Sequence, residues 1–196
     1  MKLSDKEFKA MGTPLRRTLQ RTVEYPNFVR MGLQAQDSDI LEIGCGSGYG
    51  ASLLCKQHPR SYLGIDLMPE QLALAERLSL PGAEFRLADA ADLAQVADQS
   101  KDLVVIFGVL HHIPEWRKVV SECARVLRPG GRLFVEEPDG GFILGWERLF
   151  HWGHPNEMLR LRQLEAALQQ NGMQIQRKLY AFGFGVYAAK KEGMIN

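Results

Sequence analysis

The sequence predicts an α/β protein with a parallel, doubly wound sheet, and three observations support that class. Ile40, Leu41 and Ile43 form a short apolar run that leads into a glycine-rich turn and then into a stretch able to begin a helix. Residues 102–107 form a second run that is β-branched and almost continuously apolar, as the buried central strands of parallel sheets are. Strand-like and helix-like patterns alternate through residue 137, which is the order that βαβ units require.

The bulk composition predicts one domain over residues 1–196 that acts in the cytoplasm. Hydrophobic residues make up 45% of the chain and charged residues 24%, which is ordinary for a globular protein. The net charge of +1 indicates neither a nucleic acid nor an anionic membrane as a partner. The three cysteines share no metal-ligand spacing and are expected to be reduced thiols. We expect no signal peptide and no stable membrane insertion, because the N-terminus lacks an apolar core and the longest apolar run, 103–110, is too short to span a bilayer.

Residues 1–36 precede the first predicted strand and are expected to contain a helix. Pro14 suits its first position with the preceding threonine as cap. Leu15, Leu19 and Val23 recur every four residues along it. The interpretation that we favour is an amphipathic helix packed on the edge of the sheet with its arginines in solvent, and the alternative is a basic lid over the substrate. The arginines concerned are Arg16, Arg17, Arg21 and Arg30.

The glycine loop after the first strand predicts a nucleotide-like ligand. Gly44, Gly46 and Gly48 stand at every second position, so the backbone can turn sharply and a ligand can approach it without a Cβ in the way. The spacing differs from the G-x-G-x-x-G fingerprint of dinucleotide sites. Glu42, two residues before the first glycine, would repel a pyrophosphate but suits a ligand with an ammonium group or ribose hydroxyls. The alternative is a tight strand-to-helix turn that binds no ligand.

Carboxylates after the next two predicted strands, 60–65 and 83–87, suit an adenosine group. Asp66 follows the first of them, where a carboxylate can accept hydrogen bonds from ribose hydroxyls, and the alternative is a helix cap. Pro69 fits the first position of the following helix with the preceding methionine as its cap, which leaves Asp66 for the ligand. Asp89 follows the second strand, where its carboxylate and a backbone N–H group can recognise an adenine edge.

The acid/base candidates follow the fourth and fifth predicted strands, 102–107 and 132–137. His111 and His112 come just after the fourth strand, and imidazole titrates near neutral pH. His111 is nearer the strand end and is the preferred candidate for a direct catalytic role. The alternative is that one histidine of the pair donates to a backbone carbonyl or packs in the loop. Glu137, at the end of the fifth strand, is a second candidate for substrate contact or for action as a base.

Residues 139–155 are irregular and rich in aromatic residues, which is typical of a cap over a substrate pocket. The alternative is a short helix whose aromatic side chains complete the core. His151 and His154 have no third ligand at useful spacing, so we expect no metal site. The aromatic residues concerned are Phe142, Trp146, Phe150 and Trp152. The C-terminal elements that we expect are a helix over 158–170 and an antiparallel hairpin with strands over 173–181 and 184–190.

Five short motifs follow one another along the chain: I-L-E-I-G-C-G-S-G-Y-G (40–50), L-G-I-D-L (63–67), L-A-D-A (87–90), D-L-V-V-I-F-G-V-L-H-H-I (102–113) and R-V-L-R-P-G-G-R-L-F-V-E-E-P (125–138). In this order and spacing the chain resembles the class I S-adenosylmethionine-dependent methyltransferases over about residues 38–190. The resemblance implies a Rossmann-like, three-layer α/β/α fold with seven strands in the order 3-2-1-4-5-7-6, the last-numbered strand being antiparallel. It also implies a cofactor pocket at the ends of strands 1, 2 and 4.

The resemblance implies S-adenosyl-L-methionine as the cofactor and assigns residues to each part of it. A carbonyl oxygen of Phe107 or Gly108 would accept from the ammonium group. Cys45 and Gly48 would complete the loop that contacts the cofactor. The remaining assignments are Glu42, Gly44 and Gly46 for the methionine and ribose portion, Asp66 for the ribose hydroxyls, Leu67 against the adenine, and Asp89 and Ala90 for the adenine edge.

The activity that the resemblance implies is transfer of a methyl group to a small-molecule acceptor by in-line displacement. The L-H-H-I and L-R-P-G-G segments look most like the branch that methylates small molecules and quinone or lipid precursors, and the sequence lacks the N-P-P-Y-type motif of amino-methylating enzymes. Positioning the reactants can contribute about 7–11 kcal/mol, and His111 would act as a base only if the nucleophile starts protonated. The alternatives are a non-catalytic S-adenosylmethionine-binding partner or regulator and, more remotely, an NAD-dependent oxidoreductase. The acceptor and the oligomeric state stay open.

Overall fold

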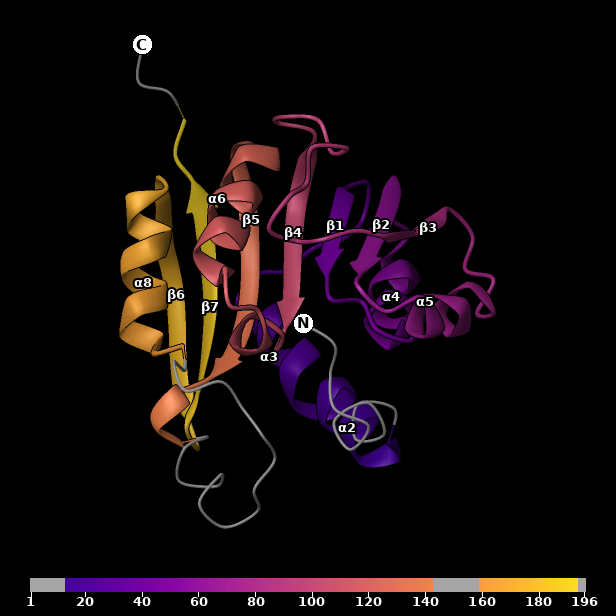
Figure 1. Cartoon of the computed structure of the whole chain (residues 1–196), viewed down its shortest axis with the longest axis horizontal. Coiled ribbons are helices and arrows are strands. Elements are labelled where there is room, and N and C mark those ends of the chain that lie inside the picture. Colours follow the sequence, from indigo (N-terminus) through magenta and orange to yellow (C-terminus); the bar gives the residue numbers. More distant parts are fainter. Residues whose placement is uncertain (1–12, 143–158, 194–196) are drawn as a thin grey trace.

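The computed structural model describes residues 13–142 and 159–193 and contains a seven-stranded sheet (Figure 1). The strand order is β3-β2-β1-β4-β5-β7-β6, and β7 runs antiparallel to both of its neighbours. This arrangement confirms the predicted Rossmann-like sheet. The strands are β1 (Asp39–Ile43), β2 (Ser61–Asp66), β3 (Ala83–Leu87), β4 (Lys101–Phe107), β5 (Leu127–Pro138), β6 (Met173–Ala181) and β7 (Phe184–Lys191).

Helices cover both faces of the sheet, which makes three layers. α6 and α8 lie on one face (Figure 1), where Val119 and Leu164 join an apolar cluster with Leu41 of β1. α3 and α4 pack on the opposite face, where Phe28 joins a cluster with Ile40 of β1. Neighbouring residues of β1 thus point to opposite apolar layers, which is why the strand reads as a continuous apolar run. The helices and helical turns are α2 (Pro14–Leu19), η1 (Gln20–Glu24), α3 (Tyr25–Arg30), α4 (Tyr49–Leu54), η2 (Cys55–Gln57), α5 (Pro69–Glu76), η3 (Leu110–His112), α6 (Trp116–Val126) and α8 (Leu161–Gln170).

Local signals decide where the first helices begin. Thr13 caps α2 through its Oγ1 atom, and Pro14 occupies the first helical position. α5 likewise begins at Pro69 with Met68 as its cap, as the sequence predicts. β5 differs from the prediction, because it begins before the R-P-G-G segment and includes it.

α2 and η1, unlike α3, turn a polar side inward and their apolar stripe outward. α2 continues through the π-helical turn η1 into α3, and α2 lies below the carboxyl ends of the central strands in Figure 1. Leu15, Leu19 and Val23 are 70%, 43% and 48% exposed, so the expected packing of this stripe against the sheet is not found. Gln20 is buried, and Arg16, which we expected in solvent, is only partly exposed because its guanidinium contacts the end of β4.

Most of the predicted substrate cap lies outside the described residues. The structure describes residues 139–142 of that segment, whereas Trp146, Phe150, Trp152, His151 and His154 fall in the part that it does not describe. The proposal of a cap therefore stays untested.

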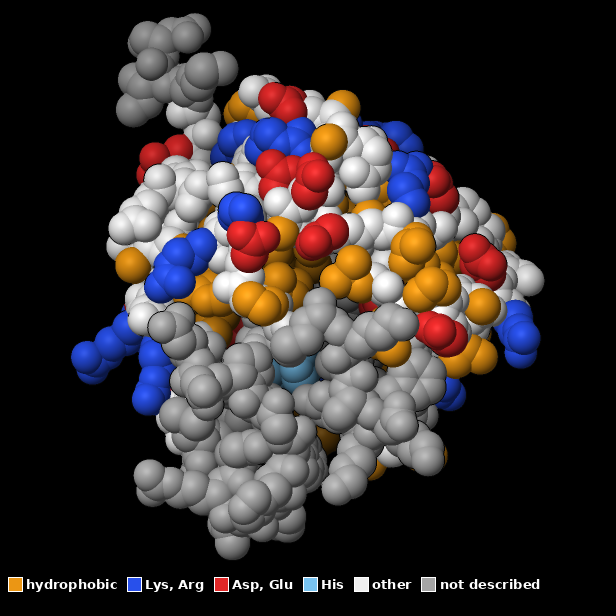
Figure 2. Space-filling model, viewed as in Figure 1, with side chains coloured by type: hydrophobic (Ala, Val, Ile, Leu, Met, Phe, Trp, Pro, Cys, Tyr) orange, Lys and Arg blue, Asp and Glu red, His pale blue; other side chains and the backbone are white. Residues whose placement is uncertain are grey.

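Charges of both signs are interspersed on the face of the molecule seen in Figure 2. Among the described residues of that face, neither sign forms a continuous patch. Within residues 13–142 and 159–193, no helix combines the length and the apolar character that crossing a bilayer requires.

Gly50 of α4 lies directly against the buried carboxylate of Glu42, and a Cβ there would overlap Glu42 Oε1. We expect Gly50→Ala to lower the free energy of unfolding by about 1–3 kcal/mol, the usual cost of overpacking a well-packed site. Urea unfolding would measure the change. Gly193→Ala is the control, because no atom lies within 4 Å of its Cβ position. Equal unfolding free energies for the two variants would contradict the packing argument.

Candidate functional site

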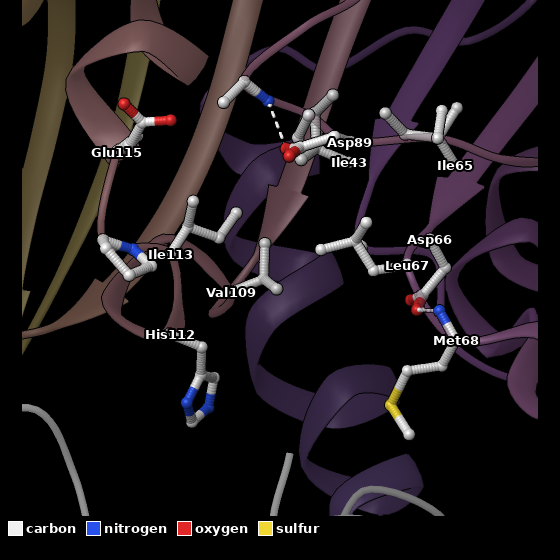
Figure 3. Close-up of a pocket in the computed structure, with 15 residues that line it drawn as sticks. Ile43, Ile65, Asp66, Leu67, Met68, Asp89, Val109, His112, Ile113 and Glu115 are labelled. Carbon is white, nitrogen blue, oxygen red and sulfur yellow. Dashed lines mark hydrogen bonds between the residues drawn. The ribbon is translucent and has the colours of Figure 1, made fainter. Parts of the chain in front are cut away.

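A pocket of about 270 Å³ opens at the carboxyl ends of β1, β2 and β4, the edge at which the resemblance places the cofactor. Ile43, Ile65 and Val109 form its apolar wall. Figure 3 shows Asp66 on one side of the pocket and His112 on the other, with Val109 between them. These residues meet because the carboxyl ends of parallel strands lie at one edge of a sheet. The remaining lining residues are Gly44, Leu67, Met68, Ala88, Asp89, Ala90, Ala91, Ile113, Pro114 and Glu115.

Two glycines of the loop are required by close contacts on either side of it. Gly44 has a φ of +67°, and a Cβ on it would lie 2.7 Å from Val109 Cγ2. Gly48 has a φ of +79°, and a Cβ on it would lie 2.9 Å from Ala75 Cβ. The loop therefore packs on the turn after β4 and on α5 at the same time, which holds it beside the pocket.

Asp66 connects the glycine loop to the turn after β2. Its Oδ2 accepts a hydrogen bond from Gly46 N at 2.8 Å, and its Oδ1 accepts one from Met68 N at 2.9 Å. Burial raises the pKa of this carboxyl, and the hydrogen bonds from the backbone oppose that rise. Each carboxylate oxygen has a second lone pair, so Asp66 can still accept from a ligand in the pocket that it lines.

Glu42 and Cys45 lie beneath the loop and do not line this pocket. Glu42 is 2% exposed, and its Oε2 accepts a hydrogen bond from the Tyr62 hydroxyl at 2.7 Å. Because successive residues of a strand alternate between faces, Ile43 faces the pocket and Glu42 faces away. Burial raises the pKa of Glu42 to about 8, the hydrogen bond from Tyr62 opposes the rise, and the Asp66 carboxylate adds to it. Burial also raises the pKa of the Cys45 thiol.

The residues predicted for the adenine edge, Asp89 and Ala90, line the pocket together with Leu67. The Oδ1 atom of Asp89 accepts a hydrogen bond from Ala91 N at 2.8 Å, which is drawn in Figure 3. Asp89 therefore stabilises a local turn through Oδ1, and its other oxygen takes no part in that turn.

Glu137 holds the turn after β4 and orients His111. Its side chain is fully buried. Its Oε1 accepts from Val109 N at 2.8 Å and from Leu110 N at 2.7 Å. Its Oε2 accepts from His111 N at 3.3 Å and lies 2.8 Å from His111 Nδ1, which donates to it in the tautomer that a carboxylate selects. These contacts give Glu137 a structural role, and they place the His111 ring against that of His112, with ring centroids 3.9 Å apart.

Three charged residues that the sequence analysis did not assign to the site meet at the ends of β4 and β5. Arg16 Nη1 pairs with the two carboxylate oxygens of Glu24 at 2.6 and 2.7 Å, and Arg16 Nη2 donates to Phe107 O at 3.4 Å. Glu136 is 5% exposed. Burial raises its pKa well above the ordinary value, the Glu24 and Glu137 carboxylates add to the rise, and Arg16 opposes it. Glu136 could have been predicted from the sequence, because two consecutive glutamates stand at the end of the fifth strand. Arg16 could not, because the N-terminal sequence does not show which of its arginines faces inward.

Comparison with known proteins agrees with this geometry. Residues 41–135, nearly half of the chain, match the family profile described as Methyltransferase domain. A protein named probable S-adenosylmethionine-dependent methyltransferase from Mycolicibacterium smegmatis is 33% identical over 156 residues, which are 79% of this chain and 59% of that protein. The phthiotriol/phenolphthiotriol dimycocerosates methyltransferase of Mycobacterium leprae is 44% identical over 96 residues, which are 48% of this chain and 35% of that protein. The chain thus spans less than two thirds of the length of these curated relatives.

The fold is shared with solved structures at lower identity. The crystal structure of an S-adenosylmethionine-dependent methyltransferase from Mesorhizobium loti matches with a TM-score of 0.76 at 18% identity. The match covers 88% of this chain and 99% of that chain. The two proteins therefore have the same architecture.

Glu42 makes the stability of the protein depend on pH. Its pKa is about 8 in the folded protein against an ordinary value of 4.5. As pH rises through this window the unfolded chain loses the proton first, so the folded state loses stability. We expect Glu42→Gln to lose less unfolding free energy than the wild type between about pH 5.5 and pH 8.5, by at most about 1.4 kcal/mol per pH unit.

Urea unfolding at four pH values would give the two slopes. Glu76→Gln, at an exposed position of α5, is the matched control and should keep the wild-type slope. Parallel slopes for Glu42→Gln and the wild type would show that another group is responsible.

Proposed function

The chain belongs to the class I S-adenosylmethionine-dependent methyltransferases, and from that membership we propose that it transfers a methyl group to a small-molecule acceptor by in-line displacement. The observation that supports this most directly is the pocket at the carboxyl ends of β1, β2 and β4, with the glycine loop beside it. Membership of the family implies S-adenosylmethionine as the cofactor. When bound, this cofactor supplies a methyl group on a sulfonium, whose sulfur leaves as a neutral thioether.

The residues around the pocket suit the adenosine part of this cofactor. Asp66 would accept hydrogen bonds from the ribose hydroxyls with the lone pairs that the backbone does not use. Leu67 and Ile65 offer apolar contact to a planar base. Asp89 and Ala90 would contact the edge of that base, where the small Ala90 side chain permits close approach.

The glycine loop and the end of β4 would hold the methionine part. Gly44 lines the pocket, Gly46 is held by Asp66, and Cys45 and Gly48 keep the loop packed on its neighbours. Glu42 would lie beneath the loop without touching the ligand, and a cationic group bound above it would favour the ionised form and lower its raised pKa. The Phe107 carbonyl, or that of Gly108, would accept from the ammonium group.

A small-molecule acceptor that is not a nucleic acid is supported by the relatives and by the charge. The Mycobacterium leprae relative is named for its action on phthiotriol and phenolphthiotriol dimycocerosates. The net charge of +1 and the mixed charges in Figure 2 offer little attraction to a polyanion. We place the activity in the cytoplasm, since the three cysteines form no disulfide within the described residues.

His111 is the base that we propose for an acceptor that starts protonated. Glu137 accepts from His111 Nδ1, so Nε2 is the ring nitrogen that carries the lone pair in the neutral form. His112 lies against His111 with the two ring planes tilted by 44°, and it lines the pocket, which suits it to position the reacting groups.

Asp66→Ala tests the cofactor site. We expect the dissociation constant for S-adenosylmethionine to rise at least tenfold in isothermal titration calorimetry, because both the ribose contact and the anchor of Gly46 are lost. Asp92→Ala is the matched control, because Asp92 accepts from Ala94 N and does not line the pocket. Wild-type protein that binds NAD and not S-adenosylmethionine would overturn the proposed function.

His111→Asn tests the base. With methyl-labelled S-adenosylmethionine and a panel of phenols, quinols and long-chain alcohols, we expect kcat to fall about 10²- to 10⁴-fold for hydroxyl acceptors, the usual contribution of a general base. Cofactor affinity should stay within twofold of wild type. An unchanged kcat would remove His111 from the chemistry, and no labelled product from any acceptor would favour the non-catalytic alternative.

A further inference from the structure

Glu136 is a buried acid without a partner among the described residues. It is 5% exposed, and no described side chain or backbone group forms a hydrogen bond or an ion pair with its carboxyl. The next residue, Glu137, is equally buried but is contacted by three backbone N–H groups and an imidazole. Removing a carboxyl from water without a described donor disfavours its ionised form, which a cation beside it would restore.

The carboxyl of Glu136 lies beside Gly108 at the end of β4. Phe107 and Glu136 are register partners in β4 and β5, and Gly108 N donates to Glu136 O at 2.8 Å. A methyl group built on Gly108 would lie 3.5 Å from Glu136 Oε2 and 3.9 Å from Arg16 Nη2. The same Arg16 nitrogen donates to Phe107 O through a long hydrogen bond of 3.4 Å. A carboxyl, a carbonyl and a guanidinium therefore surround one position at the end of β4.

The charges around this position favour a cation. Burial disfavours the ionised form of Glu136, the Glu24 and Glu137 carboxylates disfavour it further, and Arg16 opposes them. Glu24 and Glu136 thus lie on the side of the Arg16 guanidinium, which is already paired with Glu24, and the charge of Glu137 acts from the other face of the sheet. An entering anion would be repelled by the carboxyls of Glu24 and Glu136, whereas an entering ammonium group would gain an ion pair with Glu136 and a hydrogen bond to Phe107 O.

We propose that Glu136 binds the α-ammonium group at the amino-acid end of the cofactor, together with the Phe107 carbonyl. Arg16 withdraws from that carbonyl when the cofactor enters and keeps its pair with Glu24. The inference rests on the proposed function, because it requires the cofactor to lie across the ends of β1 and β4. It makes Glu136 a specificity-determining residue, which distinguishes the complete cofactor from adenosine derivatives that lack the amino group.

The test compares S-adenosylhomocysteine with its deamino analogue, in which hydrogen replaces the α-amino group. Isothermal titration calorimetry should show that the wild type binds S-adenosylhomocysteine at least tenfold more tightly than the analogue. Glu136→Gln should lose that preference by binding S-adenosylhomocysteine at least tenfold more weakly, while its affinity for the analogue stays within twofold of wild type. Glu76→Gln, at an exposed position of α5, is the matched control and should behave as wild type.

A second readout follows the proton of Glu136. Because the carboxyl must ionise to pair with an ammonium group, S-adenosylhomocysteine should release a proton on binding. Titrations near pH 6.5 in two buffers of different ionisation enthalpy would measure that release, which should be smaller in Glu136→Gln. Glu136→Met is a second variant for the case that Glu136→Gln folds poorly, because methionine keeps the length of the side chain without a charge. It should likewise lose the preference for S-adenosylhomocysteine over the deamino analogue.

The outcomes separate this inference from the proposed function. Wild-type protein that binds neither compound would overturn the proposed function itself. Wild-type protein that binds both equally, or a Glu136→Gln variant that weakens both by the same factor, would overturn the role of Glu136 and leave the cofactor site in place.

Discussion

The Glu137 carboxylate is the contact on which the functional edge of this sheet depends. It accepts three backbone hydrogen bonds from the turn after β4 and a fourth contact from the His111 ring. Hydrogen bonds to a buried carboxylate are strong, and removing the acceptor would leave buried N–H groups without a partner. Because Val109, His112 and Ile113 belong to that turn or follow it, a side chain of β5 determines where one wall of the pocket lies.

The end of β5 places one glutamate side chain on each face of the sheet, because adjacent residues of a strand point to opposite faces. Glu137 points to the side of His111 and is surrounded by donors, whereas Glu136 points to the side of α2, where no described residue donates to it. Two glutamates at consecutive positions therefore differ in their surroundings: Glu137 has several hydrogen-bond donors, and Glu136 has none among the described residues. Glu137 stabilises the turn after β4, and Glu136 lies beside Gly108 and Arg16.

α2 and η1, in contrast to α3, are attached to this edge by polar contacts. A helix usually gains most of its stability by burying an apolar face, yet Leu15, Leu19 and Val23 of this segment are largely exposed. Arg16 instead joins the segment to the end of β4 and to Glu24. Regions with few buried apolar contacts open at lower free energy than the core, and α2 has no buried residue, so we expect it to open more easily than the core helices. That property agrees with the lid alternative from the sequence, which we keep as a proposal.

The sequence by itself determined the strands, the glycine loop and the order of the motifs, because local apolar patterns, helix caps and glycine spacing record them. Asp66 at the end of a strand and Pro69 at the start of a helix could be placed without coordinates. Only the tertiary structure decided that the Glu42 side chain lies under the glycine loop. It also decided that the Glu137 carboxylate accepts hydrogen bonds from the turn after β4, and that the Arg16 guanidinium faces inward. A residue's partners come from distant parts of the chain, as Arg16 and Phe107 show across 91 positions, and local patterns carry no information about contacts made at that separation.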